Sequence, residues 1–310
     1  MAKNFDRSMQ ITSRLFMIEP VSFGFNEQTA ASNTFQEDTG QPVQQQALLE
    51  FHDFVLLLRK NQLQVTVIKD TDTPVTPDAI FPNNWISFHG DGTVVFYPML
   101  APNRRLERKQ HTLSQLEKII QIERIVDLTH LEEQEVFLEG TGSMVSDRVN
   151  KIVYACLSPR TNPAALAEFC KITGYESVVF SATDGTGKNI YHTNVMMCIA
   201  ENYAVICLDV VADDSEKDIL TTKLTLTGKD IIEITRQQVK CFAGNMLQVV
   251  NTEGEKLLIM STQAYLSLTT VQLLRLEKYN RIIHASLDHI ETAGGGSARC
   301  MIAEIFTRDI

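Results

Sequence analysis

The sequence predicts one α/β domain, residues 1–310, in which about five similar units follow one another around a closed ring. Three observations support this prediction: a recurring β-hairpin pattern, amphipathic helical stretches between the hairpins, and an unpaired strand pattern near each end of the chain. No Pro-, Gly- or Ser-rich linker interrupts the pattern, which favours a single domain. An ordinary three-layer α/β domain with coincidental spacing is the alternative.

The hairpins carry the repeat. Four segments begin at residues 84, 142, 194 and 245, so successive starts are 58, 52 and 51 residues apart. Each alternates apolar and polar residues on both sides of a turn, and the turns fall at residues 90–92, 147–150, 201–202 and 253–254.

The two ends of the chain complete the ring. One further step of about fifty residues leads to Cys300. Residues 301–306 then form one apolar strand, and no second strand follows it in the chain. Residues 14–18 form a similar strand near the start. We therefore expect these two strands to pair.

Helices and short strands fill the intervals. Apolar stripes predict helices over residues 48–58, 113–120, 163–170 and 268–276, the third beginning at the cap Asn162 and at Pro163. Residues 64–68, 177–180 and 281–283 read as strands. The unit is thus hairpin, helix, strand.

Composition limits the functions that are open to the chain. The 310 residues carry a net charge of −10 with a pI near 5.2, which argues against a nucleic-acid partner. No apolar run reaches the roughly 18 residues that a membrane helix needs, and the first residues lack a signal peptide. We expect a soluble cytoplasmic protein, whose six cysteines do not form a disulfide framework.

One cysteine differs from the other five. Cys300 follows three consecutive glycines and Arg299, a setting typical of a reactive thiol, whereas the others lie in apolar strands or on apolar helix faces. A nucleophile needs a proton shuttle, and His192 stands directly before the third hairpin. Glu139, before the second hairpin, could orient that imidazole. A core cysteine and ordinary strand-end polar residues are the alternatives.

The ring predicts where these side chains meet. Equivalent positions of the units lie at one end of the axis, so Asn84, Asn194, Asn245 and Cys300 are expected to converge. The histidines and cysteines lack metal-ligand spacing, and no Gly-rich phosphate-binding motif is present, so we expect no metal and no cofactor.

The motifs together resemble the pentein, or guanidino-group-modifying, superfamily. They occur in its order: Phe81-Pro-Asn-Asn-Trp85, Leu138-Glu-Gly-Thr-Gly142, Ser158-Pro-Arg-Thr-Asn162, His192-Thr-Asn194, Phe242-Ala-Gly-Asn245 and Gly294-Gly-Gly-Ser-Ala-Arg-Cys-Met301. Within it, the chain looks like the amidinotransferase-like citrulline utilization hydrolases. The resemblance implies a five-bladed α/β propeller of ββαβ units with pseudo-fivefold symmetry and an active site on the axis.

The resemblance also implies roles for individual residues. Cys300 matches the nucleophile, His192 the general acid/base and Glu139 the acid that orients the histidine. Arg160 matches an arginine that grips the substrate carboxylate. A second such arginine is either Arg104 or Arg105, and residues 23–26, ending at Asn26, resemble a substrate-lining loop.

Two departures from the arginine deiminases bear on the substrate. Asn84 and Asn194 stand where those enzymes carry aspartates that pair with a guanidinium. A neutral amide suits a ureido group, whereas a buried carboxylate beside it would be uncompensated. We therefore expect hydrolysis of citrulline to ornithine, ammonia and carbon dioxide.

Other functions remain open at this point. Succinylarginine hydrolases also place Asn near the first position, so an arginine-type substrate is an alternative. A true amidinotransferase and a catalytically silent binding protein are two more. The expected partner is a small amino-acid substrate, with neither nucleic acid nor a membrane, and a homodimer is one option for the assembly.

Overall fold

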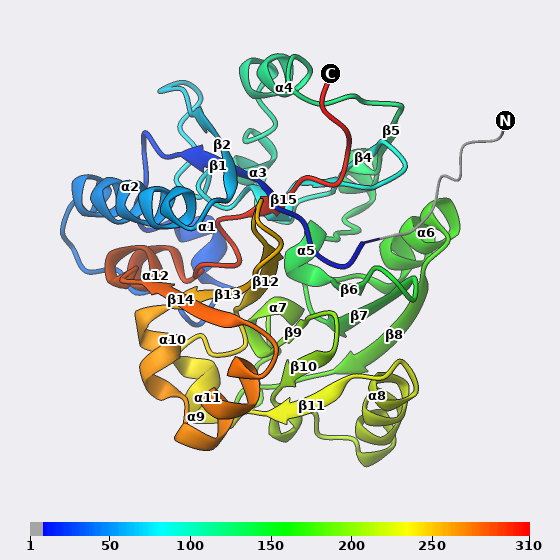
Figure 1. The fold of residues 1–310 in the computed structure, drawn as a ribbon. Helices are drawn as coiled ribbons and strands as arrows, with labels where there is room; N and C mark the ends of the chain where they lie inside the picture. The colour runs from blue at the N-terminus through cyan, green and yellow to red at the C-terminus, as the bar shows by residue number, and fades with distance from the viewer. Residues whose placement is uncertain (1–8) are drawn as a thin grey trace, which may run out of the picture.

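The computed structural model describes residues 9–310, which form five separate three-stranded sheets (Figure 1). The first sheet combines the two ends of the chain: β1 (Arg14–Glu19) lies between β2 (Gln64–Lys69) and β15 (Ala303–Glu304). The others follow in chain order: β3 (Ile86–Phe88), β4 (Thr93–Phe96) and β5 (Arg124–Asp127); β6 (Val145–Asp147), β7 (Ile152–Leu157) and β8 (Glu176–Ser181); β9 (Met197–Ile199), β10 (Tyr203–Ile206) and β11 (Asp230–Glu233); β12 (Leu247–Val250), β13 (Lys256–Ser261) and β14 (Arg281–Ala285).

All five sheets have the same pairing. The middle strand is parallel to the strand that follows it in the chain and antiparallel to its other neighbour, as for β4, which pairs Ser87 with Val95 on one side and Val95 with Val126 on the other. The sheets follow one another around the middle of the molecule (Figure 1). The four predicted hairpins are confirmed, and the three-layer alternative is wrong because the strands form five sheets instead of one.

The pairing of the chain ends is also confirmed. β15 runs antiparallel to β1, with Leu15 opposite Glu304 and Phe16 opposite Ala303. The pairing extends beyond the strand, since Thr12 Oγ1 donates to Ile305 O at 2.9 Å. Strand β15 is shorter than the predicted 301–306, because Met301 still belongs to a turn.

Helices connect the parallel strands of the units. The longer ones are α2 (Gln44–Lys60), α4 (Gln110–Leu116), α6 (Pro163–Thr173), α8 (Asp214–Leu226), α10 (Thr262–Ser267), α11 (Thr270–Glu277) and α12 (Asp288–Gly294). The short ones are α1 (Glu27–Ala30), η1 (Pro82–Asn84), α3 (Pro102–Arg105), η2 (Thr129–Gln134), α5 (Gly140–Ser143), α7 (Thr193–Met196), η3 (Leu208–Val210) and α9 (Arg236–Lys240).

The predicted helices differ from the observed ones mainly at their ends. The stretch 268–276 contains one helix, α11, which begins after Thr269 because Thr269 forms a capping box with Gln272, and α10 ends just before the stretch at Ser267. Asn162 caps α6 as expected, accepting a hydrogen bond from Ala164 N at 2.8 Å. Helix α8 was not predicted: it buries only Leu220 and Leu224, too few to give a clear stripe.

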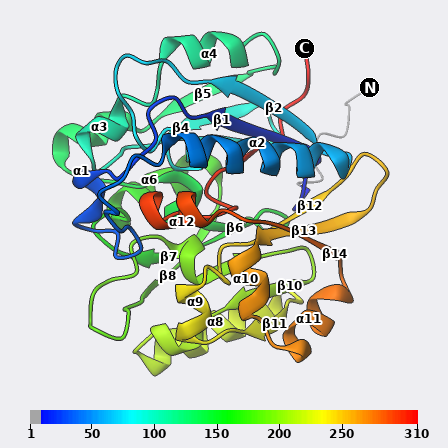
Figure 2. The same ribbon diagram turned by 90° about the vertical axis from the view of Figure 1, so that its left-hand side faces the viewer.

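Helix α2 shows how the core positions the C-terminal part of the chain. Its inner face buries Phe51, Phe54 and Leu58 completely, each stabilising the fold by roughly 1.5–3 kcal/mol. Its Glu50 carboxylate accepts hydrogen bonds from the backbone N–H groups of His289 and Ile290 at the start of α12. Figure 2 shows α12 directly beneath α2.

No helix among residues 9–310 is both long and apolar enough to cross a membrane.

Candidate active site

Short helical turns bring three of the hairpin starts together at the centre. These turns are η1, α5 and α7, and α5 contacts both of the others. Two positions of α5 leave no room for a side chain: a Cβ at Gly140 would lie 2.3 Å from Asn83 O, and one at Gly142 would lie 2.5 Å from Asn84 Nδ2 and 2.7 Å from His192 Nδ1. The starts of three hairpins, at residues 84, 142 and 194, therefore lie close together, and their approach depends on glycine.

The sulfur of Cys300 lies beside two side-chain amides. Asn245 Nδ2 donates to Sγ at 3.2 Å, and Asn194 Nδ2 donates to it at 3.5 Å. Asn245 is itself fixed, since Nδ2 also donates to Asn194 O and Oδ1 accepts from Arg299 N. Two amide donors are well placed to stabilise negative charge on the sulfur.

His192 and Glu139 form a buried pair. The imidazole Nε2 donates to Glu139 Oε2 at 2.8 Å, and Leu100 N donates to Oε1 at 3.0 Å. Burial opposes charge on Glu139, but Arg160 and the bond from His192 hold the pKa of this carboxyl well below its usual range. Burial lowers the pKa of His192 to about 4 despite its hydrogen bond to Glu139, so the imidazole is neutral near pH 7 in this structure.

Arg104, and not Arg105, faces the site. Arg104 is fully buried and donates to Asn84 Oδ1 at 2.7 Å, while Nε and Nη2 form a fork on the Glu107 carboxylate at 2.7 and 3.0 Å. Arg105 instead donates to the carbonyl of Leu100 with a partly exposed side chain. Arg105 therefore does not line the cavity.

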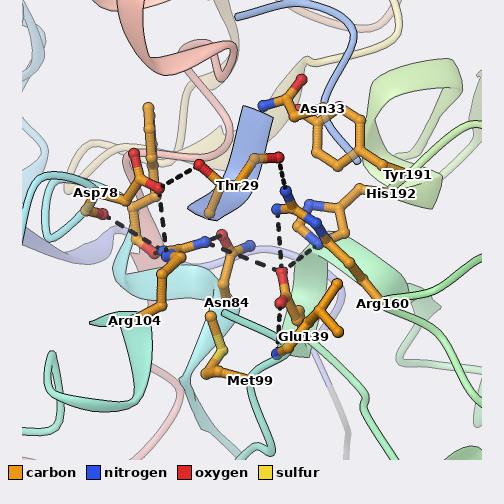
Figure 3. Close-up of polar contacts among 12 residues, drawn as sticks. Thr29, Asn33, Asp78, Asn84, Met99, Arg104, Glu139, Arg160, Tyr191 and His192 are labelled. Carbon is orange, nitrogen blue, oxygen red and sulfur yellow. Dashed lines mark hydrogen bonds and ion pairs between the residues drawn. The ribbon is translucent and has the colours of Figure 1, made fainter. Parts of the chain in front are cut away.

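Arg104 and Arg160 approach the Glu139 carboxylate from two sides, and Arg104 Nη1 lies 4.0 Å from Glu139 Oε2. Arg160 Nη1 lies 3.4 Å from Glu139 Oε2, and Figure 3 shows Arg104 and Arg160 pointing at Glu139 from opposite directions. Arg160 Nη2 donates to Thr29 O at 2.9 Å and to Ser32 Oγ at 2.8 Å. Arg160 thus also holds the segment that covers the cavity.

One buried acid in the site was not predicted. Asp78 Oδ2 accepts from Asn26 Nδ2 at 2.7 Å and from Thr29 Oγ1 at 3.1 Å, while Oδ1 is buried without a partner. An aspartate directly after Pro77 and before the apolar start of the first motif was the available sequence signal. Asn26 supports Asp78 and does not itself line the cavity.

These residues line a small cavity. The lining includes Asn33, Asp78, Asn84, Arg104, Arg160, Tyr191, His192 and Cys300, and the free space for the centre of a water-sized sphere is about 10 Å³. That space holds about one water molecule. Residues 26–37, hereafter the covering segment, contribute Thr29 and Asn33 to the lining.

The remaining cysteines lie in different surroundings. Burial raises the pKa of Cys156 and of Cys198 to about 12 and that of Cys207 to about 11. Thiols of this kind are poor nucleophiles near neutral pH. Among residues 9–310 no group of three or more His, Cys, Asp or Glu side chains is arranged to hold a metal ion.

The sequence of this chain matches one known protein family. The family described as "N,N dimethylarginine dimethylhydrolase, eukaryotic" matches residues 19–307, nearly the whole chain. The chain belongs to this family. It is therefore a member of the pentein superfamily, whose enzymes act on guanidino groups, as the sequence motifs indicated. A search of curated proteins by sequence gave no match.

Solved pentein structures share the fold. ArgZ, an arginine dihydrolase from the ornithine-ammonia cycle in cyanobacteria, has a TM-score of 0.76 and 17% identity over 96% of this chain and 41% of ArgZ. Its N-terminal domain bound to substrate has a TM-score of 0.74 and 16% identity, covering 94% of this chain and 97% of that domain. A dimethylarginine dimethylaminohydrolase adduct with S-methyl-L-thiocitrulline has a TM-score of 0.64 and 14% identity, covering 95% and 100%. This chain thus spans less than half of full-length ArgZ.

Proposed function

We propose that this pentein is a hydrolase that cleaves a C–N bond in the ureido or guanidino group of an amino acid, with Cys300 as nucleophile. The observation that carries the proposal is the joint placement of Cys300, with two amides at its sulfur, and the His192–Glu139 pair at one small cavity. In this proposal the five sheets are the blades of a propeller with pseudo-fivefold symmetry, and the cavity lies on its axis.

The chemistry would proceed in two steps. Cys300 Sγ attacks the central carbon of the planar group while its proton passes to neutral His192. His192 then gives that proton to the departing amine, which leaves a carbamoyl or amidino thioester on Cys300. Water, deprotonated by His192, attacks the thioester carbon and releases the thiol. Glu139 fixes the imidazole throughout.

Citrulline is the substrate that we favour. Asn84 lines the cavity and Asn194 contacts Cys300 Sγ, so both bring neutral amides close to the nucleophile, and Asn194 Oδ1 is buried without a hydrogen-bond partner. A ureido group needs such donors and acceptors but no counter-charge. The products would be ornithine, ammonia and carbon dioxide.

Arginine is a second candidate, because Asp78 supplies a negative charge that the sequence motifs did not show. Asp78 lines the cavity 3.8 Å from Arg104 Nε, and its Oδ1, which has no hydrogen-bond partner, could pair either with an α-ammonium group or with a guanidinium. The similar structures also favour this candidate: ArgZ is an arginine dihydrolase, and one ArgZ variant is covalently bound to a reaction intermediate.

The amino-acid end of either substrate would bind near Arg160. This guanidinium lies beside Glu139 and the covering segment, and a substrate carboxylate could replace its contacts with Thr29 O and Ser32 Oγ. Because the cavity has room for about one water, we expect the covering segment to move away before substrate enters.

The test compares substrates in parallel. The chain is incubated with citrulline, arginine, succinylarginine and agmatine, and the products are identified by mass spectrometry, with Cys300→Ala as control. We expect ornithine from citrulline at a kcat/KM at least about tenfold above that for arginine, a difference of roughly 1.4 kcal/mol. Equal or better turnover of arginine would move the chain to the guanidine-acting enzymes, and turnover by Cys300→Ala would exclude the nucleophile.

A further inference from the structure

The turn that carries Cys300 is held from inside the protein. Cys300 N donates to Ser297 O at 2.9 Å, so the position of Ser297 sets the direction in which the thiol leaves the turn. Ser297 is fully buried, and its hydroxyl donates to Glu291 Oε1 at 2.5 Å. Glu291 also accepts from Gly295 N with its backbone carbonyl at 2.9 Å. One residue therefore holds this turn at two points.

Glu291 is anchored in turn to another unit. Its second carboxylate oxygen accepts from Gln263 Nε2 at 2.9 Å, and Gln263 belongs to α10, which follows the fourth hairpin. The chain of contacts runs from α10 through the Glu291 carboxylate to Ser297 and then to Cys300.

Holding a carboxylate here costs free energy. Glu291 is 2% exposed, and burial raises the pKa of its carboxyl group. The nearby charge of Asp288 raises this pKa further, whereas hydrogen bonds from the neutral groups of Ser261, Ser297 and Gln263 lower it. An amide or an apolar side chain would avoid this cost. A buried side chain that costs more free energy than its alternatives is typical of functional sites.

We infer that Glu291 is a positioning residue for the nucleophile: with Gln263 and Ser297 it fixes the turn that holds Cys300 Sγ between the amides of Asn194 and Asn245. This role rests on the proposed function. The two contacts to the sulfur, at 3.5 and 3.2 Å, leave little tolerance, and a displacement of about 1 Å in such a site can cost about a hundredfold in rate.

The experiment uses three variants. Ser297→Ala removes the hydroxyl, and we expect kcat with citrulline and the rate of Cys300 alkylation by iodoacetamide to fall at least about tenfold, with KM changed less than about threefold. Glu291→Leu alone should lower both rates like Ser297→Ala, whereas Glu291→Gln combined with Gln263→Glu exchanges acid and amide, which keeps complementary donors and acceptors, so both rates should return to within about threefold of the unmodified chain.

The control is Asp288→Ala, an exposed acid at the start of the same helix that holds Ser286 and does not touch the turn. It should leave both rates unchanged, and peptide mass spectrometry separates alkylation at Cys300 from that at other cysteines. Full alkylation and kcat in a folded Ser297→Ala, or failure of the exchanged pair to recover either rate while folded, overturns the inference. If the unmodified chain turns over no ureido or guanidino substrate, the proposed function fails, whereas alkylation still decides the role of Glu291.

Discussion

Replacing Asn194 by aspartate tests how a negative charge beside Cys300 affects the reaction. In the structure Asn194 Nδ2 donates to Cys300 Sγ at 3.5 Å. Asn194→Asp substitutes a carboxylate oxygen for this donor and sets two negative charges side by side whenever Cys300 is a thiolate. Asn194→Ala removes the donor without adding charge. The difference between the two variants therefore isolates the charge.

The distance gives the size of the effect. Two unit charges 3.5 Å apart repel by about 5 kcal/mol at an effective dielectric constant of about 20. That corresponds to roughly three orders of magnitude in rate. Loss of the hydrogen bond alone costs about 1.5–3 kcal/mol, or one to two orders of magnitude. A guanidinium substrate would offset part of the added charge, whereas a ureido substrate would not.

The assay measures kcat/KM for citrulline and for arginine, together with iodoacetamide alkylation of Cys300 at pH 7. We expect Asn194→Asp to lose citrulline turnover at least about tenfold more than Asn194→Ala, to lose less with arginine, and to alkylate more slowly. If Asn194→Asp and Asn194→Ala behave alike with both substrates and with iodoacetamide, the electrostatic reasoning is refuted.

Three further outcomes follow from the site. Because the pKa of His192 is about 4 in the folded chain and near 6.5 when unfolded, the unfolded state binds more protons between these values, so the free energy of unfolding should decrease as the pH falls from 6.5 to 4. Denaturant titrations should show this dependence weakened in His192→Asn. Arg160→Ala should raise KM at least about tenfold while Arg105→Ala leaves it unchanged, since Arg160 lines the cavity and Arg105 does not; equal effects in steady-state kinetics would contradict that assignment. Asp78→Asn should raise KM for arginine and citrulline alike if Asp78 binds the α-ammonium group, and for arginine alone if it binds the guanidinium.

Much of the architecture was accessible from the sequence because hairpins and amphipathic helices are local patterns. Alternation and turn residues predicted all four internal hairpins, and the lone strand patterns predicted the pairing of β1 with β15. The motifs also named Cys300, His192, Glu139 and Asn194, since their types and order along the chain already indicate the chemistry. The weakly amphipathic α8 could not be predicted, because its burial depends on few side chains.

The sequence by itself thus determined the repeat, the closure of the ring and the catalytic candidates. Only the tertiary structure decided which arginine faces the cavity, that Asp78 lines it with one carboxylate oxygen that lacks a hydrogen-bond partner, and that Glu291 holds the turn of Cys300. The reason is physical: a side chain's role here depends on partners from other units, as when Arg104 reaches Asn84 or Gln263 reaches Glu291, and such contacts leave no periodic signal along the chain.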